Sequence, residues 1–194
     1  AAAEQIFNST VSRGSLDDAF NELLVAVEDN SEVHRVVMPY RARHLVELIG
    51  TEHAHTLLRQ SVRYCVKSES EAYRANCKGG RDVLPILLEE YRLLEPRKAA
   101  RSADDAFVSG YRGSGAAALA DGFPGDAIGE AVSLAANQLV LRDAGRPESQ
   151  ARPPEKPVGS VHGDSIGVHA SDAATACRNM SRYGTERNRI ACLI

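Results

Sequence analysis

The residues best suited to chemistry lie near the end of the chain, after a proline-rich stretch. His162 and His169 are seven positions apart, and Asp172 follows His169 by three positions. At ~100° per residue, a helix that starts at about Val161 places both histidines on one apolar stripe. The other members of this stripe are Ile166, Ala173, Cys177 and Met180. Burying an imidazole costs free energy unless its ring nitrogens are paired, so the stripe predicts either a reactive pocket or a hydrogen-bonded core.

An enzyme hypothesis gives each of these polar side chains a role. His162 and His169 would act as general base or metal ligands, and Asp172 would orient an imidazole, since a carboxylate fixes its tautomer. Ser165 flanks the stripe and Arg59 lies on another predicted helix, and both are expected to contact the substrate. Arginine binds carboxylate or phosphate through paired hydrogen bonds, which points to an anionic small molecule. The alternative for the arginines of this chain is surface ion pairing.

A metal site is the second part of the enzyme hypothesis. His162 and His169 alone would lie about 10 Å apart along a helix, too far to share one ion. His55, from a helix over residues 52–66, is therefore expected to face them and complete the ligand set. Imidazole and carboxylate ligands suit iron or zinc, which are the cofactors expected here. The alternative is that the polar residues around His55 are solvated or cap the helix, because they form neither HExxH nor the Glu-x-x-His of di-iron bundles.

Two segments carry a resemblance to a known family. Glu52-His-Ala-His-Thr-Leu-Leu58 and the segment from Val161 to Ala170 resemble the histidine-bearing helices of questin-oxidase-like proteins. The resemblance covers these two short parts of the chain. What it implies is an oxidoreductase or oxygenase, which is the enzyme class expected here for a pocket between residues 161–183 and 52–66.

The elements that must position these residues are expected to be helices throughout. Strand-forming residues never alternate in a sustained way, so the chain is predicted to be all-α. Residues 1–194 are expected to form one domain of packed antiparallel helices, with residues 145–159, which contain four prolines, as a surface loop or linker. The predicted helices cover residues 4–13, 15–27, 39–49, 51–65, 81–94, 103–111, 115–120, 127–141 and 161–183, and Thr185 caps a last one.

An internal echo offers a comparison for the histidines. Residues 126–136 and 164–174 share Asp, Ile, Gly, Ser and two Ala at matching positions. This spacing is typical of helical repeats, and the alternative is chance matching between alanine-rich segments. Ala131 stands in the first copy where His169 stands in the second, so the same face can be built without an imidazole.

Composition excludes several function classes. The 194 residues are 43% hydrophobic and 25% charged with a formal net charge of −3, which is typical of a soluble globular protein and argues against nucleic-acid binding. No apolar run approaches the ~18 residues that a membrane span needs. The four cysteines form no CxxC pair, so we expect reduced thiols and a cytoplasmic protein, with a disulfide between Cys65 and Cys77 as the alternative.

The chain ends on an apolar segment, Ile190-Ala-Cys-Leu-Ile194, without a polar cap. This ending predicts that the chain is a fragment of a longer one, or that the segment docks on a partner subunit or a second copy in a homo-oligomer. Together with the echo it supports the competing hypothesis, a non-catalytic helical scaffold or interaction subunit of a larger assembly.

Overall fold

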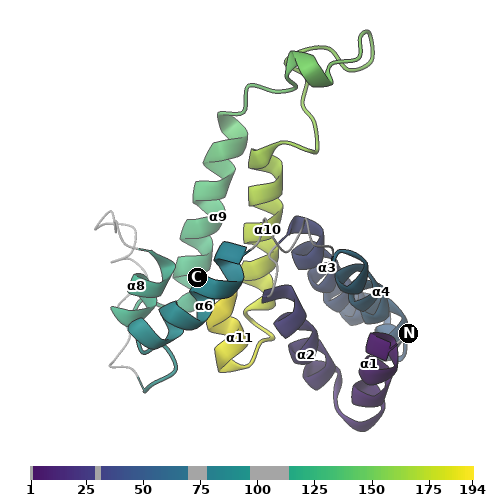
Figure 1. Ribbon diagram of the computed structural model, residues 1–194, viewed down its shortest axis with the longest axis vertical. Coiled ribbons are helices and arrows are strands. Elements are labelled where there is room, and N and C mark those ends of the chain that lie inside the picture. The colour runs from purple at the N-terminus through teal and green to yellow at the C-terminus, as the bar shows by residue number, and fades with distance from the viewer. Residues whose placement is uncertain (1, 29–31, 70–77, 97–113) are drawn as a thin grey trace.

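The computed structural model describes residues 2–28, 32–69, 78–96 and 114–194, and the elements in these ranges are helical (Figure 1). The predicted all-α architecture is therefore confirmed, and the helix expected at residues 103–111 lies outside the described residues. The helices are α1 (Ala2–Arg13), α2 (Leu16–Glu28), α3 (Val33–Ile49), α4 (Ala54–Lys67), α6 (Lys78–Glu90), α8 (Gly115–Ala120), α9 (Gly125–Leu141), α10 (Ile166–Met180) and α11 (Glu186–Ala191), with 3-10 turns at Thr51–His53 and Glu148–Gln150. None of the helices in these ranges has both the length and the apolar composition needed to cross a bilayer.

Helices α1 to α4 pack around a first core. The apolar stripe of α4 expected from its periodicity is buried as predicted, with Leu58 at its centre. α2 begins with a capping box, in which the Ser15 hydroxyl accepts from the Asp18 N–H at 3.1 Å and the Asp18 carboxylate accepts from the Ser15 N–H at 2.8 Å. α10 closes this core with Ala176 and Met180, both fully buried.

A second core lies beside the first, around α8 and α11 (Figure 1). Its buried members are Leu93, Ala116, Ala118, Leu119, Phe123, Ile128, Ile190 and Leu193. α11 is also tied to the first group of helices, because the Asn188 side-chain amide donates to the Asn21 carbonyl at 2.9 Å. Within the apolar C-terminal segment, Ile190 and Leu193 are buried in this core, whereas Ala191, Cys192 and Ile194 are half-buried.

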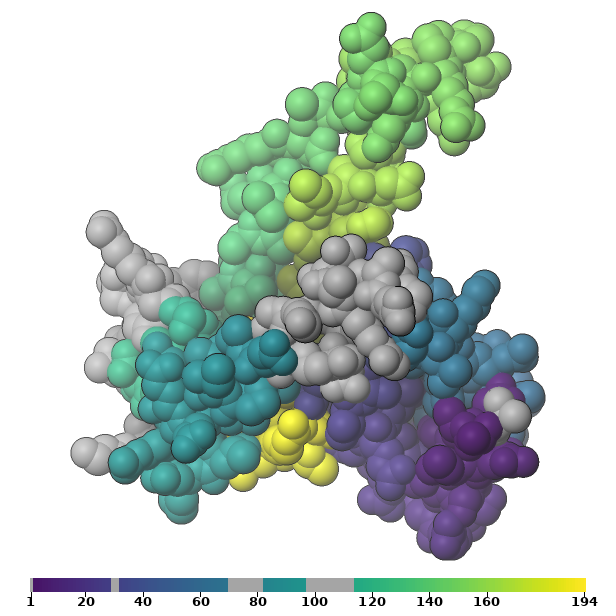
Figure 2. Space-filling view, viewed as in Figure 1, coloured from purple at the N-terminus to yellow at the C-terminus, as the bar shows by residue number. Residues whose placement is uncertain are grey.

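Helices α9 and α10 form an antiparallel hairpin that extends away from both cores (Figures 1 and 2). The glycine shared by the two echo segments lies at a close approach in each helix. A Cβ on Gly129 would lie 2.9 Å from Cγ of Arg178, and a Cβ on Gly167 would lie 2.8 Å from the Leu139 carbonyl carbon and the Val140 nitrogen. At Gly167 the neighbouring atoms belong to the backbone of α9, so only glycine allows that approach, whereas at Gly129 the neighbouring atoms belong to the side chains of Arg178 and Leu193.

The segment between α9 and α10, residues 142–165, extends beyond the hairpin and is mostly exposed (Figure 2). It contains one 3-10 turn, at Glu148–Gln150, where the sequence predicted none. Arg146 and Ser160 join its two arms, since the Arg146 N–H donates to the Ser160 carbonyl at 2.8 Å.

Two predicted helix starts are wrong, and both errors have a local cause. α3 begins at Val33 rather than at Pro39, because the Glu32 carboxylate caps it by accepting from the Arg35 N–H at 3.2 Å. Pro39 therefore lies inside the helix. α10 begins at Ile166 rather than at about Val161, because the Ser165 hydroxyl caps it.

The late start of α10 corrects the predicted apolar stripe. His162 precedes the helix and is not on its surface. Ile166, in the first turn, is 83% exposed, whereas Met180 at the other end of the stripe is fully buried. Of the two histidines, only His169 lies on α10.

The close approach at Gly167 gives a stability prediction. We expect Gly167→Ala to force the two helices apart and lower the free energy of unfolding by about 1–3 kcal/mol. Gly163→Ala is the matched control, because a Cβ there meets no atom within 4 Å. Urea unfolding followed by circular dichroism measures both changes, and equal stability of the two variants would contradict the predicted approach of the backbones.

Candidate functional site

The structure brings His169 to a cluster of polar side chains where α3, α4 and α10 meet. The His169 ring meets the His34 ring edge-on, with 6.0 Å between centroids. The His34 ring also lies 5.8 Å from the Tyr64 ring. Together with Glu32, these side chains form the His34 cluster, which we define as Glu32, His34, Tyr64 and His169.

Glu32 holds the His34 cluster together. One carboxylate oxygen contacts Nδ1 of His34, and the other accepts from the Tyr64 hydroxyl at 3.2 Å and from the Arg35 N–H at 3.2 Å. Burial raises the pKa of this carboxyl, but the hydrogen bonds from His34 and Arg35 and the charge of His34 outweigh burial, so its pKa lies below the ordinary value. Glu32 is therefore ionised at neutral pH.

This geometry suits acid–base chemistry at His34. A carboxylate on Nδ1 favours the tautomer that carries its proton there, which leaves Nε2 able to accept a proton. The His34 side chain is 59% exposed, so a small molecule can reach the ring. A base that is oriented by a carboxylate and open on its other side meets the geometric requirement for general-base catalysis.

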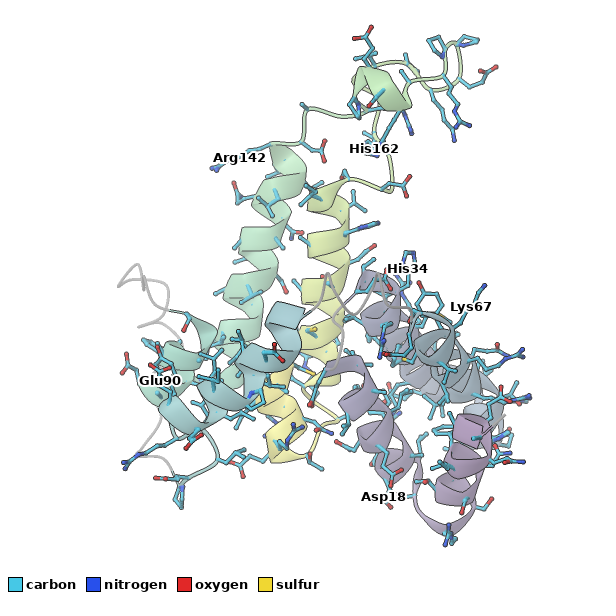
Figure 3. All side chains as sticks on the ribbon, in the orientation of Figure 1. Asp18, His34, Lys67, Glu90, Arg142 and His162 are labelled. Carbon is cyan, nitrogen blue, oxygen red and sulfur yellow. The ribbon has the colours of Figure 1, made fainter. Side chains whose placement is uncertain are left out.

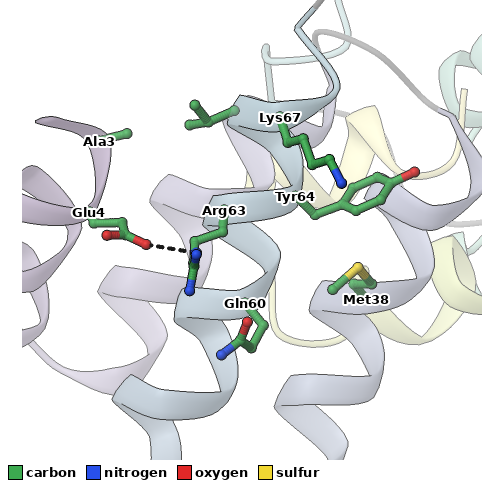
Figure 4. A pocket seen from close by; sticks show the side chains of 8 residues that line it. Ala3, Glu4, Met38, Gln60, Arg63, Tyr64 and Lys67 are labelled. Carbon is green, nitrogen blue, oxygen red and sulfur yellow. Dashed lines mark ion pairs between the residues drawn. The ribbon is translucent and has the colours of Figure 1, made fainter. Parts of the chain in front are cut away.

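A hollow of about 420 Å³ lies beside the cluster, and Tyr64 belongs to both (Figure 4). Its lining residues are Ala3, Glu4, Met38, Gln60, Arg63, Tyr64, Val66 and Lys67. Arg63 pairs with Glu4 at 3.2 Å, and Figure 4 shows the Lys67 amino group extending toward the Tyr64 ring. The volume fits a small molecule, and the excess of positive charge favours an anionic one.

His162 lies elsewhere, at the end of the hairpin (Figure 3), and its carbonyl accepts from the Ser165 N–H at 3.4 Å. Asp143 accepts from the Gly145 N–H at 2.7 Å. A hydrogen bond from the Ser165 side chain, then that from Gly145, and the charge of His162 hold the pKa of Asp143 below its ordinary value. His162 is 9% exposed, and its Nδ1 has no hydrogen-bond partner. The arrangement fastens the loop to the first turn of α10, away from His169.

The remaining predicted site residues face other parts of the molecule. Nε2 of His55 contacts the Asn8 side chain, and Arg59 pairs with Glu4 at 3.4 Å, so both belong to the contact between α4 and α1. Asp172 is exposed and forms no hydrogen bond with His169.

The predicted metal ligands are therefore not assembled. His55, His162 and His169 contact three different parts of the chain, and the described ranges contain no group of three or more His, Cys, Asp or Glu placed to hold a metal ion. The physical reasons are the late start of α10, which removes His162 from the helix, and the orientation of His55 toward α1. Within the part of the chain that the structure describes, no donor set for iron or zinc is assembled.

Sequence reasoning missed Glu32, His34 and Tyr64. The signal for the first two was a capping residue followed two positions later by an imidazole, which is visible only when the start of α3 is placed at Val33. Tyr64 carried no signal, because its role depends on which face of α4 meets α3.

Comparisons with protein-family models, with curated protein sequences and with solved structures found no match to this chain. Its function is therefore inferred from the geometry of its own residues.

The lowered pKa of Glu32 gives a pH prediction. An ionised Glu32 stabilises the fold fully above its ordinary pKa of 4.5, and this stabilisation is lost as the pH falls through the lower value of the folded state. We expect Glu32→Gln to lose less stability than the parent chain between neutral pH and about pH 3. Glu52→Gln, at a carboxylate that is 71% exposed, should keep the parent's acid sensitivity. Urea unfolding at several pH values tests this, and parallel curves for parent and Glu32→Gln would contradict it.

Proposed function

We propose that the protein is an enzyme that removes a proton from an anionic small molecule, with His34 as general base. The observation that supports this best is the His34 ring, which is held by the Glu32 carboxylate at Nδ1 and exposed on its other side. This proposal moves the expected site between the segments 161–183 and 52–66 to α3, where the His34 ring contacts the rings of His169 on α10 and Tyr64 on α4.

The side chains of the cluster take different roles in this proposal. His34 accepts the proton at Nε2, and Glu32 is a positioning residue that stabilises the resulting imidazolium. His169 lies edge-on to His34, where it can exchange a proton with the substrate or with solvent. Lys67 and Arg63 in the neighbouring hollow attract the anionic part of the substrate.

The oxidoreductase or oxygenase class remains part of the proposal. Removing a proton next to a carbonyl produces an electron-rich enolate, which is the form of such a molecule that gives up electrons most readily. No step is assigned to iron or zinc, because the donor set is not assembled. Free thiols at Cys65, Cys177 and Cys192 support a location in the cytosol.

Solvent exchange tests the proton-transfer step without any oxidant. A panel of enolisable keto acids is incubated with the chain in deuterated water, and proton NMR follows loss of the signal next to the carbonyl. We expect accelerated exchange for at least one compound, and a rate about 100-fold lower for His34→Ala. His53→Ala, at another exposed histidine, is the matched control and should exchange like the parent.

The proposal is wrong if the parent chain accelerates exchange of no compound in the panel. It is also wrong if folded His34→Ala, checked by circular dichroism, is as fast as the parent.

The alternative is a non-catalytic interaction subunit, and one observation favours it. Exposed apolar side chains gather on α9 and at the start of α10, on the hairpin that extends from the body (Figure 2). Leu141 is 77% exposed and Ile166 is 83% exposed. Apolar surface of this kind is typical of contacts with another protein. The contact surface would then be the hairpin rather than the C-terminal segment, where Leu193 is buried.

Sedimentation velocity over a range of concentrations tests this alternative. It predicts that the chain self-associates, and that Leu141→Glu gives a monomer because a charge on the contact surface opposes association. Val25→Glu changes a half-exposed apolar residue on α2 and should leave association unchanged. A parent chain that is monomeric at every concentration rejects self-association through the hairpin.

A further inference from the structure

Two thiols meet at the boundary between the two cores. Cys177 of α10 and Cys192, the residue that follows α11, are both free and half-buried. Both side chains pack against the first core, and each thiol shifts the pKa of the other. Cys177 lies within α10 and Cys192 lies just after α11, so their proximity is set by the tertiary fold.

Both sulfur atoms border a hollow of about 570 Å³ between α9, α10 and the C-terminal segment. The other lining residues are Gly115, Gly129, Val132, Ala135, Ala136, Leu139, Ala170, Ala173, Ala174, Arg178, Leu193 and Ile194. The small side chains of the hairpin create this space, and it is wide enough for a small reactant to reach the thiols.

The two thiols differ in character. The hydrogen bond from Cys192 lowers the pKa of Cys177, although burial opposes this. The same hydrogen bond, together with burial and the negative charges of Cys177 and Glu28, raises the pKa of Cys192 well above its ordinary value. Cys65 differs from both, since burial in the first core raises its pKa. A thiolate is the nucleophilic form of cysteine, so Cys177 is the thiol that reacts first.

We propose that Cys177 and Cys192 are a redox modification site, at which hydrogen peroxide forms an intramolecular disulfide. The Cys177 thiolate attacks one peroxide oxygen, the O–O bond breaks, and the sulfenic acid of Cys177 forms while the departing hydroxide takes up a proton from solvent and becomes one water. The Cys192 thiol then attacks the Cys177 sulfur, the S–S bond forms, and the sulfenic hydroxyl leaves with the Cys192 proton as a second water. In total the two thiols lose two electrons and two protons, and the peroxide takes them up as the two waters form.

This disulfide would fix the two cores to each other. Met180 of α10 belongs to the first core, and Ile190 and Leu193 around Cys192 belong to the second. A covalent bond between α10 and the C-terminal segment limits how far the two groups of helices can separate, so the oxidised chain should have a higher Tm than the reduced chain.

Peptide mass mapping of the full chain tests the proposal. The reduced chain is treated with hydrogen peroxide, alkylated, digested and analysed by mass spectrometry. We expect the chain to lose the mass of two hydrogen atoms and to yield a peptide cross-linked between Cys177 and Cys192, and dithiothreitol should break this cross-link. We also expect Cys177 to be oxidised about 10-fold faster than Cys65. In Cys192→Ala the second step is blocked, so dimedone should trap a sulfenic acid at Cys177. Cys65→Ala is the matched control and should form the disulfide at the parent's rate.

Three outcomes of the peptide mapping would overturn the proposal. A disulfide that joins other cysteines, links between chains only, or modification of Cys65 before Cys177 would each reject it. The mapping of the unsubstituted chain decides the question even where a cysteine variant does not fold. The proton-transfer proposal does not enter this experiment, because no substrate is present.

Discussion

The buried guanidinium of Arg35 is the interaction on which the N-terminal group of helices depends. Arg35 is 1% exposed, and it bonds the Glu69 carboxylate at 2.5 Å and the Ala26 carbonyl. A buried charge is costly unless it is paired, so the end of α2, the first turn of α3 and the residues after α4 must converge on this cation. The same turn carries Glu32 and His34. The cation that fixes the packing therefore also fixes the base and the carboxylate that orients it.

α10 connects this group to the rest of the molecule because each side of it meets a different neighbour. Its small residues, with Ala170 among them, face α9 and border the thiol hollow. Its buried Met180 faces the first core, and His169 contacts His34. In the echo segment on α9, Ala131 takes the position of His169. The packing of the hairpin therefore does not require the His169 imidazole. This ring lies where His34 of α3 can contact it.

Local sequence signals predicted the helices well and the site in part. The capping box at Ser15 and the apolar stripe around Leu58 placed α2 and α4, since both signals act within a few residues along the chain. The predicted starts of α3 at Pro39 and of α10 at about Val161 are wrong, because the side chains of Glu32 and Ser165 cap the two helices. Those two errors account for the missed His34 and for the wrong position of His162.

The cost of burying an imidazole explains why His169 belongs to the candidate site and His162 does not. His169 remains half-buried at the edge of the core, where ring contact with His34 replaces part of its hydration. His162 is nearly enclosed, and its unpaired Nδ1 is offset only by the charge of Asp143 nearby. In the His34 cluster, Glu32 is bonded to His34, Tyr64 and the Arg35 N–H, so the carboxylate can hold the His34 ring in one orientation while a proton moves at its other nitrogen. The acid–base chemistry that we propose therefore belongs to the junction of α3, α4 and α10 rather than to the end of the hairpin.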